Sequence, residues 1–451
     1  MLRNNQPPRS RRSRNVLAIP KSFLARGSLG SLGIKIITVG LAFVTQLLLA
    51  RLMGAGQYGV YVYALTWLNA LGLFARLGTD GLLTRFAAAY VAEGKWALLR
   101  GLVRFGYRSV GLASLGFGLV ALAAIWALRV DLGPDRYSTF LAALVLLPIS
   151  TLWSVGQSLL FGLKRPWRAQ LPEPISRLLM LPLIGAVYWH FGTLSAVPTM
   201  LCGAAAGLAA LVLGTYWLRR ALPRPLSPVA AVSAAGDWFA VAMPMLLMAF
   251  LRMLLSQSDI LLIGWLLNDA GAAGIYAVAT RLAELTTFGL QAANTTLAPT
   301  IAELHATRQH GRLQDAVTRS TRAVFAFTVA ASLGLALFGE PILAVFGPEF
   351  TAAYPPLLIL LAGQTVNAAT GSVGYLMTMT GHQREAAWLV AIAGTLTVAL
   401  NFTLIPRFGI QGAAIANATG MSLVNLAMLA YVGIRLKINS TVFRRMGYGP
   451  A

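Results

Sequence analysis

Residues 54–61 read GAGQYGVY, and residues 269–276 read DAGAAGIY. The offset between the two patterns is 274 − 59 = 215, which aligns Gly59 with Gly274 and Tyr61 with Tyr276. Three further pairs follow in the same order: 92–100 with 309–317 (311 − 94 = 217), 161–165 with 380–384 (384 − 165 = 219), and 190–196 with 407–413 (409 − 192 = 217). Four ordered matches at a nearly constant offset predict two copies of one structural unit.

The composition around this repeat indicates a membrane protein. Hydrophobic residues make up 57% of the 451 residues, and charged residues make up 11%, against about 25% in a soluble domain. Twelve apolar runs, each about 20 residues long and sufficient to cross a bilayer, lie at 29–51, 58–79, 105–128, 138–161, 174–191, 196–218, 239–267, 272–295, 323–346, 354–380, 386–405 and 411–434. The net charge of +22 therefore belongs to neither a disordered basic chain nor a soluble nucleic-acid binder.

The basic residues predict the orientation of these spans. With the N-terminus inside, the cytoplasmic segments hold seven, four, three, three, four, one and four Lys or Arg residues, a total of 26. The outside loops hold four, namely Arg51, Arg129, Arg136 and Arg407. Because cytoplasmic loops carry an excess of Lys and Arg, this distribution predicts an even number of spans with both termini in the cytoplasm.

Both copies of the repeat begin inside, so the repeat is parallel. We predict an all-α polytopic membrane protein with about twelve transmembrane helices in two six-helix lobes. The predicted parts are a basic tail (1–28), an N-terminal lobe (29–218), a Pro-rich linker (219–238), a C-terminal lobe (239–434) and a second tail (435–451). Two such lobes are typical of a transporter with a central cavity.

Motifs for catalysis are absent from the sequence. Cys202 is the single cysteine, and the four histidines (His190, His305, His310 and His382) have no metal-ligand spacing. No nucleophile-elbow, zinc-protease or phosphate-loop motif is present. The sequence therefore predicts a transporter, not an enzyme, with no cofactor and no bound metal.

Three stretches carry a family resemblance: 47–67 (LLLARLMGAGQYGVYVYALTW), 345–361 (VFGPEFTAAYPPLLILL) and 405–418 (IPRFGIQGAAIANA). They resemble the polysaccharide-transporter branch of the multidrug/oligosaccharidyl-lipid/polysaccharide (MOP) flippase superfamily, and the resemblance covers the chain after residue 28. It implies export of a polyprenyl-pyrophosphate-linked oligosaccharide, such as an O-antigen or exopolysaccharide unit, across the bacterial inner membrane. The lipid II flippase branch usually has two additional helices, which this sequence lacks.

Charged side chains within membrane spans are costly and mark functional sites. The deep cations Lys35, Arg76, Arg252 and Arg281 outnumber the deep anions Asp259 and Glu284. Lys35 and Arg252 hold equivalent places in the repeat, since 252 − 35 = 217. We predict that the four cations give the cavity a positive surplus that suits a pyrophosphate group.

Two other arginines lie nearer the ends of the predicted spans. Arg108 is close enough to the cytoplasmic end for its side chain to reach the membrane surface. For Arg177 both this position and a cavity-facing position stay open.

Uncharged polar residues add to this prediction. Gln46, Asn69, Tyr276, Gln291 and Asn367 lie on polar helix faces. We expect them to line the cavity and accept sugar hydroxyls, and the alternative is hydrogen bonding between helices.

Asp259 and Glu284 have two interpretations. They form structural ion pairs with Arg252 and Arg281, or one of them binds a coupling H⁺ or Na⁺. The expected partners are membrane lipids, the lipid-linked oligosaccharide and a glycan polymerase, but no nucleic acid.

Three other functions are compatible with parts of the sequence. A multidrug or small-metabolite antiporter of the same superfamily would have an acidic cavity. A membrane-embedded glycan polymerase or ligase would need a large outside loop, and the longest predicted outside loop has about ten residues. A major-facilitator sugar transporter also has twelve helices, but residues 79–94 lack its charged loop signature.

Overall fold

The computed structural model describes residues 21–223 and 229–443, and side chains from residue 33 onward. Most of the predicted basic tail, part of the linker and residues 444–451 lie outside the described residues. The described part of the chain is helical and contains no strand. Its helices are α1 (Lys21–Ala75), α2 (Thr79–Glu93), α3 (Trp96–Ala127), α4 (Arg129–Gly162), α5 (Pro166–Gln170), α6 (Pro172–Phe191), α7 (Ala196–Ala221), α8 (Ala235–Leu266), α9 (Ala270–Leu285), α10 (Phe288–Ala306), α11 (His310–Phe346), η2 (Pro348–Ala353), α12 (Tyr354–Thr370), α13 (Val373–Met379), α14 (Gln383–Tyr431) and η3 (Val432–Leu436).

Glycines divide the longest helices into two arms. The 55 residues of α1 would extend for about 82 Å as one straight helix, far beyond the roughly 30 Å hydrocarbon core of a bilayer. Gly54 breaks this run with φ 70° and ψ 169°, and Gly409 breaks the 49-residue α14 with φ 56°. Such positive φ values favour glycine because it has no Cβ. A predicted pair of spans therefore occupies each of these two helices.

The two arms of α14 lie against each other. A Cβ at Gly412 would overlap the backbone carbonyl of Leu404, and one at Gly420 would overlap the side chain of Thr397. Small residues let the two backbones approach closely, as in many membrane helix pairs. The arms therefore form an antiparallel hairpin.

Each of the twelve predicted spans is mostly helical, although 272–295 crosses the break between α9 and α10, and 354–380 crosses the break between α12 and α13. Seven helices are long and apolar enough to cross a membrane by themselves, or eight if the pair 348–370 and 373–379, bent by 43°, is one span. The prediction of a polytopic helical membrane protein is confirmed. The number of crossings stays a prediction.

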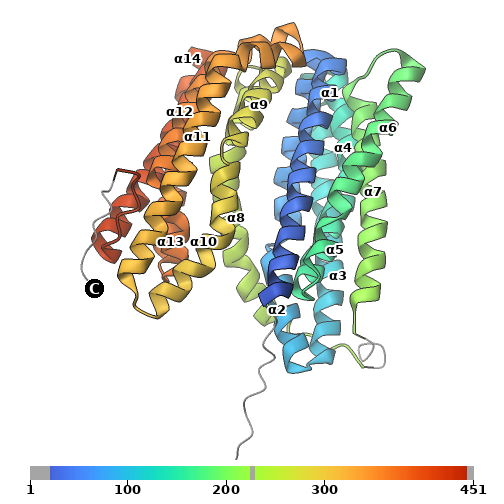
Figure 1. Ribbon diagram of the computed structural model, residues 1–451. Helices are drawn as coiled ribbons and strands as arrows, with labels where there is room; N and C mark the ends of the chain where they lie inside the picture. The colour runs from blue at the N-terminus through green and yellow to red at the C-terminus, as the bar shows by residue number, and fades with distance from the viewer. Residues whose placement is uncertain (1–20, 224–228, 444–451) are drawn as a thin grey trace, which may run out of the picture.

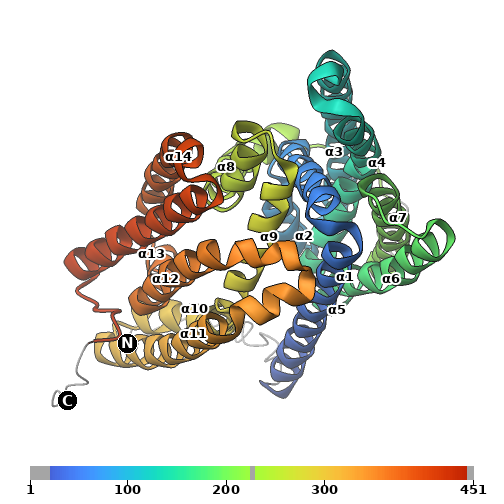
Figure 2. The same ribbon diagram turned by 90° about the horizontal axis from the view of Figure 1, so that it is seen from above.

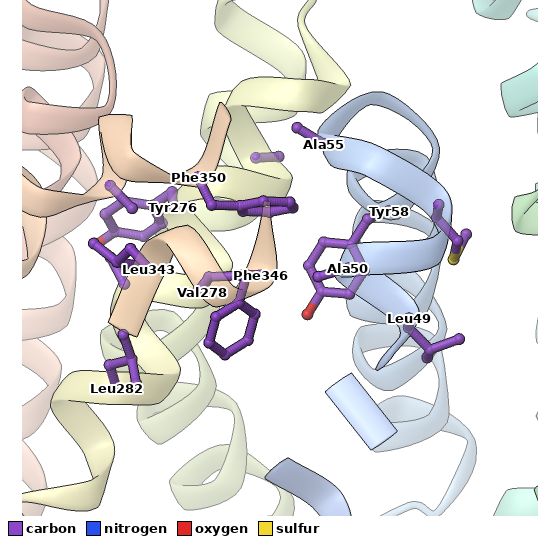
Figure 3. Packing of buried hydrophobic residues seen from close by; sticks show 14 of the residues in the cluster. Leu49, Ala50, Ala55, Tyr58, Tyr276, Val278, Leu282, Leu343, Phe346 and Phe350 are labelled. Carbon is purple, nitrogen blue, oxygen red and sulfur yellow. The ribbon is translucent and has the colours of Figure 1, made fainter. Parts of the chain in front are cut away.

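The two halves of the chain stand side by side, with α1–α7 in blue to green and α8–α14 in yellow to red (Figure 1). Seen from above, α1, α8 and α9 lie between the outer helices of the two halves (Figure 2). The largest hydrophobic cluster spans this boundary and joins Tyr58 of α1 to Tyr276 of α9, Phe346 of α11 and Phe350 of η2 (Figure 3). The core thus lies between the halves as well as within each of them.

The repeat glycines mark the centre of this boundary. A Cβ on Gly59 would overlap the Ala270 carbonyl, and a Cβ on Gly274 would lie 2.8 Å from the Cα and N atoms of Gly59. Equivalent residues of two copies meet only near the axis that relates them. The pseudo-twofold axis of the repeat therefore passes close to Gly59 and Gly274.

Helix α8 contributes to both halves. Trp238, near its start, is fully buried against the first half, and its Nε1 donates a hydrogen bond of 3.0 Å to the Tyr90 hydroxyl. Ile263, near its end, belongs to the cluster between the halves. Helix α7 continues to Ala221 and α8 begins at Ala235, so the segment that joins them lies within the predicted linker 219–238.

Candidate functional site

A cavity of about 360 Å³ lies between the two halves. Helices α1, α4, α6 and α7 line it from the first half, and α8 and α9 line it from the second. Its uncharged polar lining residues include Thr45, Gln46, Thr66, Asn69, Ser150, Ser176, Ser256, Gln257 and Thr280. The wall thus combines hydroxyl and amide groups with the apolar side chains of the helices.

Each half also contributes an ion pair to the cavity wall. In α6, Arg177 lies 3.9 Å from Glu173, and in α9, Arg281 lies 2.8 Å from Glu284. The spacings i, i+4 and i, i+3 bring these side chains to neighbouring places on one helix surface. The two lining arginines are therefore matched by two lining glutamates, and the predicted positive surplus is not present in the wall itself.

Lys35 and Arg252 are exposed and are not among the described residues that line the cavity. Lys35 shares a face of α1 with Gln46, about three turns or roughly 16 Å away along the helix. Arg252 lies one turn before Ser256 on the same face of α8. Both cations thus lie on helix faces that lead to the cavity from the predicted cytoplasmic side.

Arg76 lies at a different place. Together with Asp80, Met245 and Met248 it lines a second hollow, of about 440 Å³, between α1, α2 and α8. Its guanidinium is 3.6 Å from the Asp80 carboxylate and also donates to the Gly72 carbonyl. The prediction that Arg76 shares one cavity with Arg281 therefore finds no geometric support.

Of the five predicted polar lining residues, Gln46 and Asn69 line the cavity. Tyr276 is fully buried and donates to Asp259 instead. Gln291 is exposed on α10 and donates to Thr287, while Asn367 donates to Gln364 within α12. These three side chains are therefore engaged away from the lining that the structure describes.

Asp259 is the most buried of the predicted charged groups, with 1% of its surface exposed. Its carboxylate accepts hydrogen bonds from the Tyr276 hydroxyl at 2.6 Å, the Asn417 amide at 3.0 Å and the Ile260 backbone at 3.0 Å. Among the described residues Arg252 forms no ion pair with it, which corrects that interpretation. Neutral donors from the second half therefore surround this carboxyl group.

Asn401 adds an unusual feature to the same region. It is fully buried, and neither side-chain atom has a hydrogen-bond partner in the described part of the chain. The contact of Gly420 with Thr397 sets the register of the α14 hairpin, which places Asn401 opposite the turn that carries Asn417. An uncompensated buried amide is costly, and the oxygen and nitrogen of Asn401 are without a partner among the described residues.

Sequence reasoning left Arg177 open and missed Glu173. The available signal was the i, i+4 spacing of the two residues in the first turns of a helix that begins at Pro172. An acid four residues before an arginine is the favourable order for a helix surface pair. The pair with Glu173 assigns Arg177 to one face of α6. The distance of Arg177 from the helix end does not show which face it occupies.

Residues 24–305, more than half of the chain, match the family described as polysaccharide biosynthesis protein. The chain belongs to this polysaccharide biosynthesis protein family. One relative is the probable low-salt glycan biosynthesis flippase Agl15 of Haloferax volcanii, 24% identical over 429 residues, which are 90% of this chain and 83% of that protein. Another is the probable flippase AglR of the same organism, 28% identical over 175 residues, which are 38% of this chain and 37% of that protein.

Solved structures share the fold of this family member. An inward-facing multidrug resistance MATE family transporter of the MOP superfamily has a TM-score of 0.68 at 15% identity, over 91% of this chain and 98% of that one. The lipid II flippase MurJ in an inward closed conformation has a TM-score of 0.68 at 14% identity, over 90% of this chain and 87% of that one. The predicted all-α membrane fold is thereby confirmed, and the predicted resemblance to a polysaccharide-transporter family agrees with the match over residues 24–305.

Proposed function

We propose that this protein is a flippase that moves a polyprenyl-pyrophosphate-linked oligosaccharide from the cytoplasmic to the outer leaflet by alternating access. The chain is a transporter: its relatives are named as probable flippases, and its structural neighbours include a lipid II flippase. One observation carries the proposal: a polar cavity lies between two related halves, and each half contributes one arginine to it. Rocking of the halves would expose such a cavity to one leaflet at a time.

Arg177 and Arg281 are the proposed pyrophosphate ligands. A guanidinium group binds phosphate oxygens through paired hydrogen bonds. Without substrate, Glu173 and Glu284 neutralise the two cations, and the arriving pyrophosphate would replace them as partner. Because the two arginines belong to different halves, one ligand between them would couple binding to the relative position of the halves.

The other predicted residues have supporting roles in this proposal. Lys35 and Arg252 would attract the anionic headgroup along the faces that lead into the cavity. Gln46 and Asn69 would bind sugar hydroxyls without demanding one particular glycan. Arg76, which is paired outside the cavity, has no part in headgroup binding.

Asp259 is the proposed site for the coupling ion. A buried carboxylate held by neutral donors gains stability when a proton or Na⁺ neutralises it. The Asn401 amide, which has no partner among the described residues and lies opposite the helix turn of Asn417, would supply a further oxygen for a metal cation. Glu284, which pairs with Arg281 on the cavity wall, would act as its structural counter-ion and not in coupling.

We further propose that both termini lie in the cytoplasm and that the protein resides in the inner, cytoplasmic membrane. The uneven distribution of Lys and Arg over the loops supports this orientation. A glycan polymerase that acts on the exported product would be the functional partner.

The proposal is tested with Arg177→Ala, Arg281→Ala and the double variant in a flippase-deficient strain or in proteoliposomes that contain a lipid-linked oligosaccharide. Losing a charge-assisted bidentate contact should lower the transport rate by about tenfold or more. Arg312→Ala is the matched control, because Arg312 is exposed at the start of α11 and bonds only to Gln309 in the described structure. Wild-type transport by the double variant at equal protein level would refute the proposed site.

The charge balance of the cavity wall favours a second candidate, a multidrug or small-metabolite antiporter. Two lining glutamates would accept a cationic drug as readily as two lining arginines would accept an anion. Drug efflux that depends on Glu173 and Glu284, with no glycan defect in the arginine variants, would support this candidate over the flippase.

A further inference from the structure

A second sequence repeat lies at the end of the molecule that is predicted to face outside. Residues 133–135 read GPD and residues 347–349 read GPE, at an offset of 347 − 133 = 214. Both glycines have positive φ values, 69° at Gly133 and 146° at Gly347. The two turns therefore hold equivalent places in the two halves.

The turn of the second half contacts the first half. The Glu349 carboxylate accepts a hydrogen bond from the backbone N–H of Ala55, which is the first residue after the break of α1 at Gly54. A carboxylate at this place caps the exposed N–H groups of a helix start. In the same region an Arg51 Nη atom donates to the Val345 carbonyl at 3.1 Å.

The turn of the first half makes the reciprocal contact with the second half. Arg136, the residue after the GPD motif, donates to both the side-chain oxygen and the backbone carbonyl of Asn268, each at 2.7 Å. Asn268 has φ 49° and links α8 to α9, as Gly54 links the two arms of α1. Each Gly-Pro-acid turn thus binds the helix link of the opposite half.

An aromatic layer lies below these contacts. Tyr58 packs edge-on against Phe350 with 5.9 Å between the ring centroids, and Phe346 packs against Phe350 at 6.3 Å (Figure 3). Phe43 of α1 extends the layer with an edge-on contact to Phe346 at 5.8 Å. Tyr58 also lines the cavity, so the layer connects the cavity wall to the turn that carries Glu349.

We propose that Glu349 and Arg136 form a reciprocal clasp that keeps the cavity closed at this end, and that both contacts release when the cavity opens there. The Glu349 and Asn268 side chains are exposed and that of Arg136 is half-buried, whereas Ala55, whose N–H Glu349 caps, is buried. Water can replace the exposed Arg136–Asn268 hydrogen bonds at small cost. Release of the Glu349 contact also requires water to reach the Ala55 N–H. The proposal rests on the alternating access proposed above, to which it adds the residues that hold one state.

The test measures how fast a cavity cysteine reacts with a membrane-impermeant maleimide. Cys202→Ser removes the single native cysteine, and Ile149→Cys places the reporter on the cavity wall. Thr193→Cys, in the exposed turn between α6 and α7, identifies the vesicle preparation that presents the clasp end to the reagent. The clasp is weakened by Glu349→Ala, by Arg136→Ala and by both together.

Gln57→Ala is the matched control. Gln57 lies at the same end, but among the described residues its side chain bonds only to Asp135 and to the Ala196 backbone, both in its own half. All variants are first compared by size-exclusion chromatography, and only folded protein is assayed.

When the maleimide is added on the clasp side, Glu349→Ala and Arg136→Ala should each raise the labelling rate by about threefold to tenfold. This is the change expected when the loss of one polar contact increases the population of the state that is open at this end. The double variant should exceed both, and Gln57→Ala should match the parent. Unchanged rates in both single variants, or an equal rise in Gln57→Ala, would overturn the clasp. Because labelling requires no substrate, a wrong assignment of the transported molecule would leave this result intact.

Discussion

Replacing Gly59 by alanine tests the packing at the centre of the molecule. In an ordinary helix this change is favourable by about 1 kcal/mol. At Gly59, however, the new Cβ would overlap the Ala270 carbonyl, and at Gly274 it would lie against the Gly59 backbone. Gly56 lies one turn earlier in the same motif, and a Cβ added there would have no neighbouring atom within 4 Å. It is therefore a matched control.

The expected change in the free energy of unfolding combines the gain in helix propensity with the cost of the steric overlap. Overpacking a close contact costs about 1–3 kcal/mol, and a backbone carbonyl yields less readily than a side chain, which places Gly59→Ala at the upper end of this range. After the gain in helix propensity is subtracted, we expect a net destabilisation of about 2 kcal/mol. For Gly56→Ala the cost is absent, and the expected change is between zero and about 1 kcal/mol of stabilisation.

The assay is thermal unfolding of the purified protein followed by tryptophan fluorescence. Gly59→Ala and Gly274→Ala should lower the melting temperature by several degrees, whereas Gly56→Ala should leave it unchanged or raise it. A Gly59→Ala protein that melts at or above the wild-type temperature would refute the close crossing. An equal decrease in all three variants would show that the effect comes from loss of glycine in general and not from the contact.

Three further variants test contacts within the second half and between α8 and the first half. Tyr276→Phe removes the 2.6 Å hydrogen bond to Asp259 and should destabilise the protein by about 1.5–3 kcal/mol; the loss should shrink in an Asp259→Asn background, and an equal loss there would argue against the charged acceptor. Trp238→Phe leaves a tyrosine hydroxyl of α2 without its buried donor and should cost about 1 kcal/mol, which an unaltered melting curve would contradict. Gln314→Ala removes two hydrogen bonds that hold the backbone of Asn439, so hydrogen exchange in residues 438–443 should accelerate, and unchanged protection would exclude this role.

The fold follows from features that a sequence displays directly. Long apolar runs identify membrane helices because a bilayer requires about 20 residues for each crossing. The offset between the halves also paired Gly59 with Gly274, and the structure brings the two residues into contact. Which glycines reverse the chain was not predictable, because Gly54 and Gly409 are two among 44 glycines and only their backbone angles distinguish them.

The site was predicted less completely for a different physical reason. Charge within a span shows that a residue avoids lipid, but the rotation and depth of its helix decide which surface it reaches. Arg281 and Glu284 reach the cavity wall, whereas Lys35 and Arg252 lie outside the lining. Tyr276 meets Asp259 across a helix link, 17 residues away in the chain, and no periodicity within one helix reveals such a pair.

Two of the contacts that join the halves differ in chemistry, and we expect them to have different tasks. Gly59 and Gly274 meet beside the pseudo-twofold axis through backbone atoms, where an added methyl group has no room. Glu349 and Arg136 instead reach from the turns of one half to the helix links of the other through polar side chains. Variants at the two glycines should therefore mainly change the stability of the fold, while variants of the clasp should change the balance between states. A clasp variant that lowers the melting temperature as strongly as Gly59→Ala without altering cavity labelling would contradict this division.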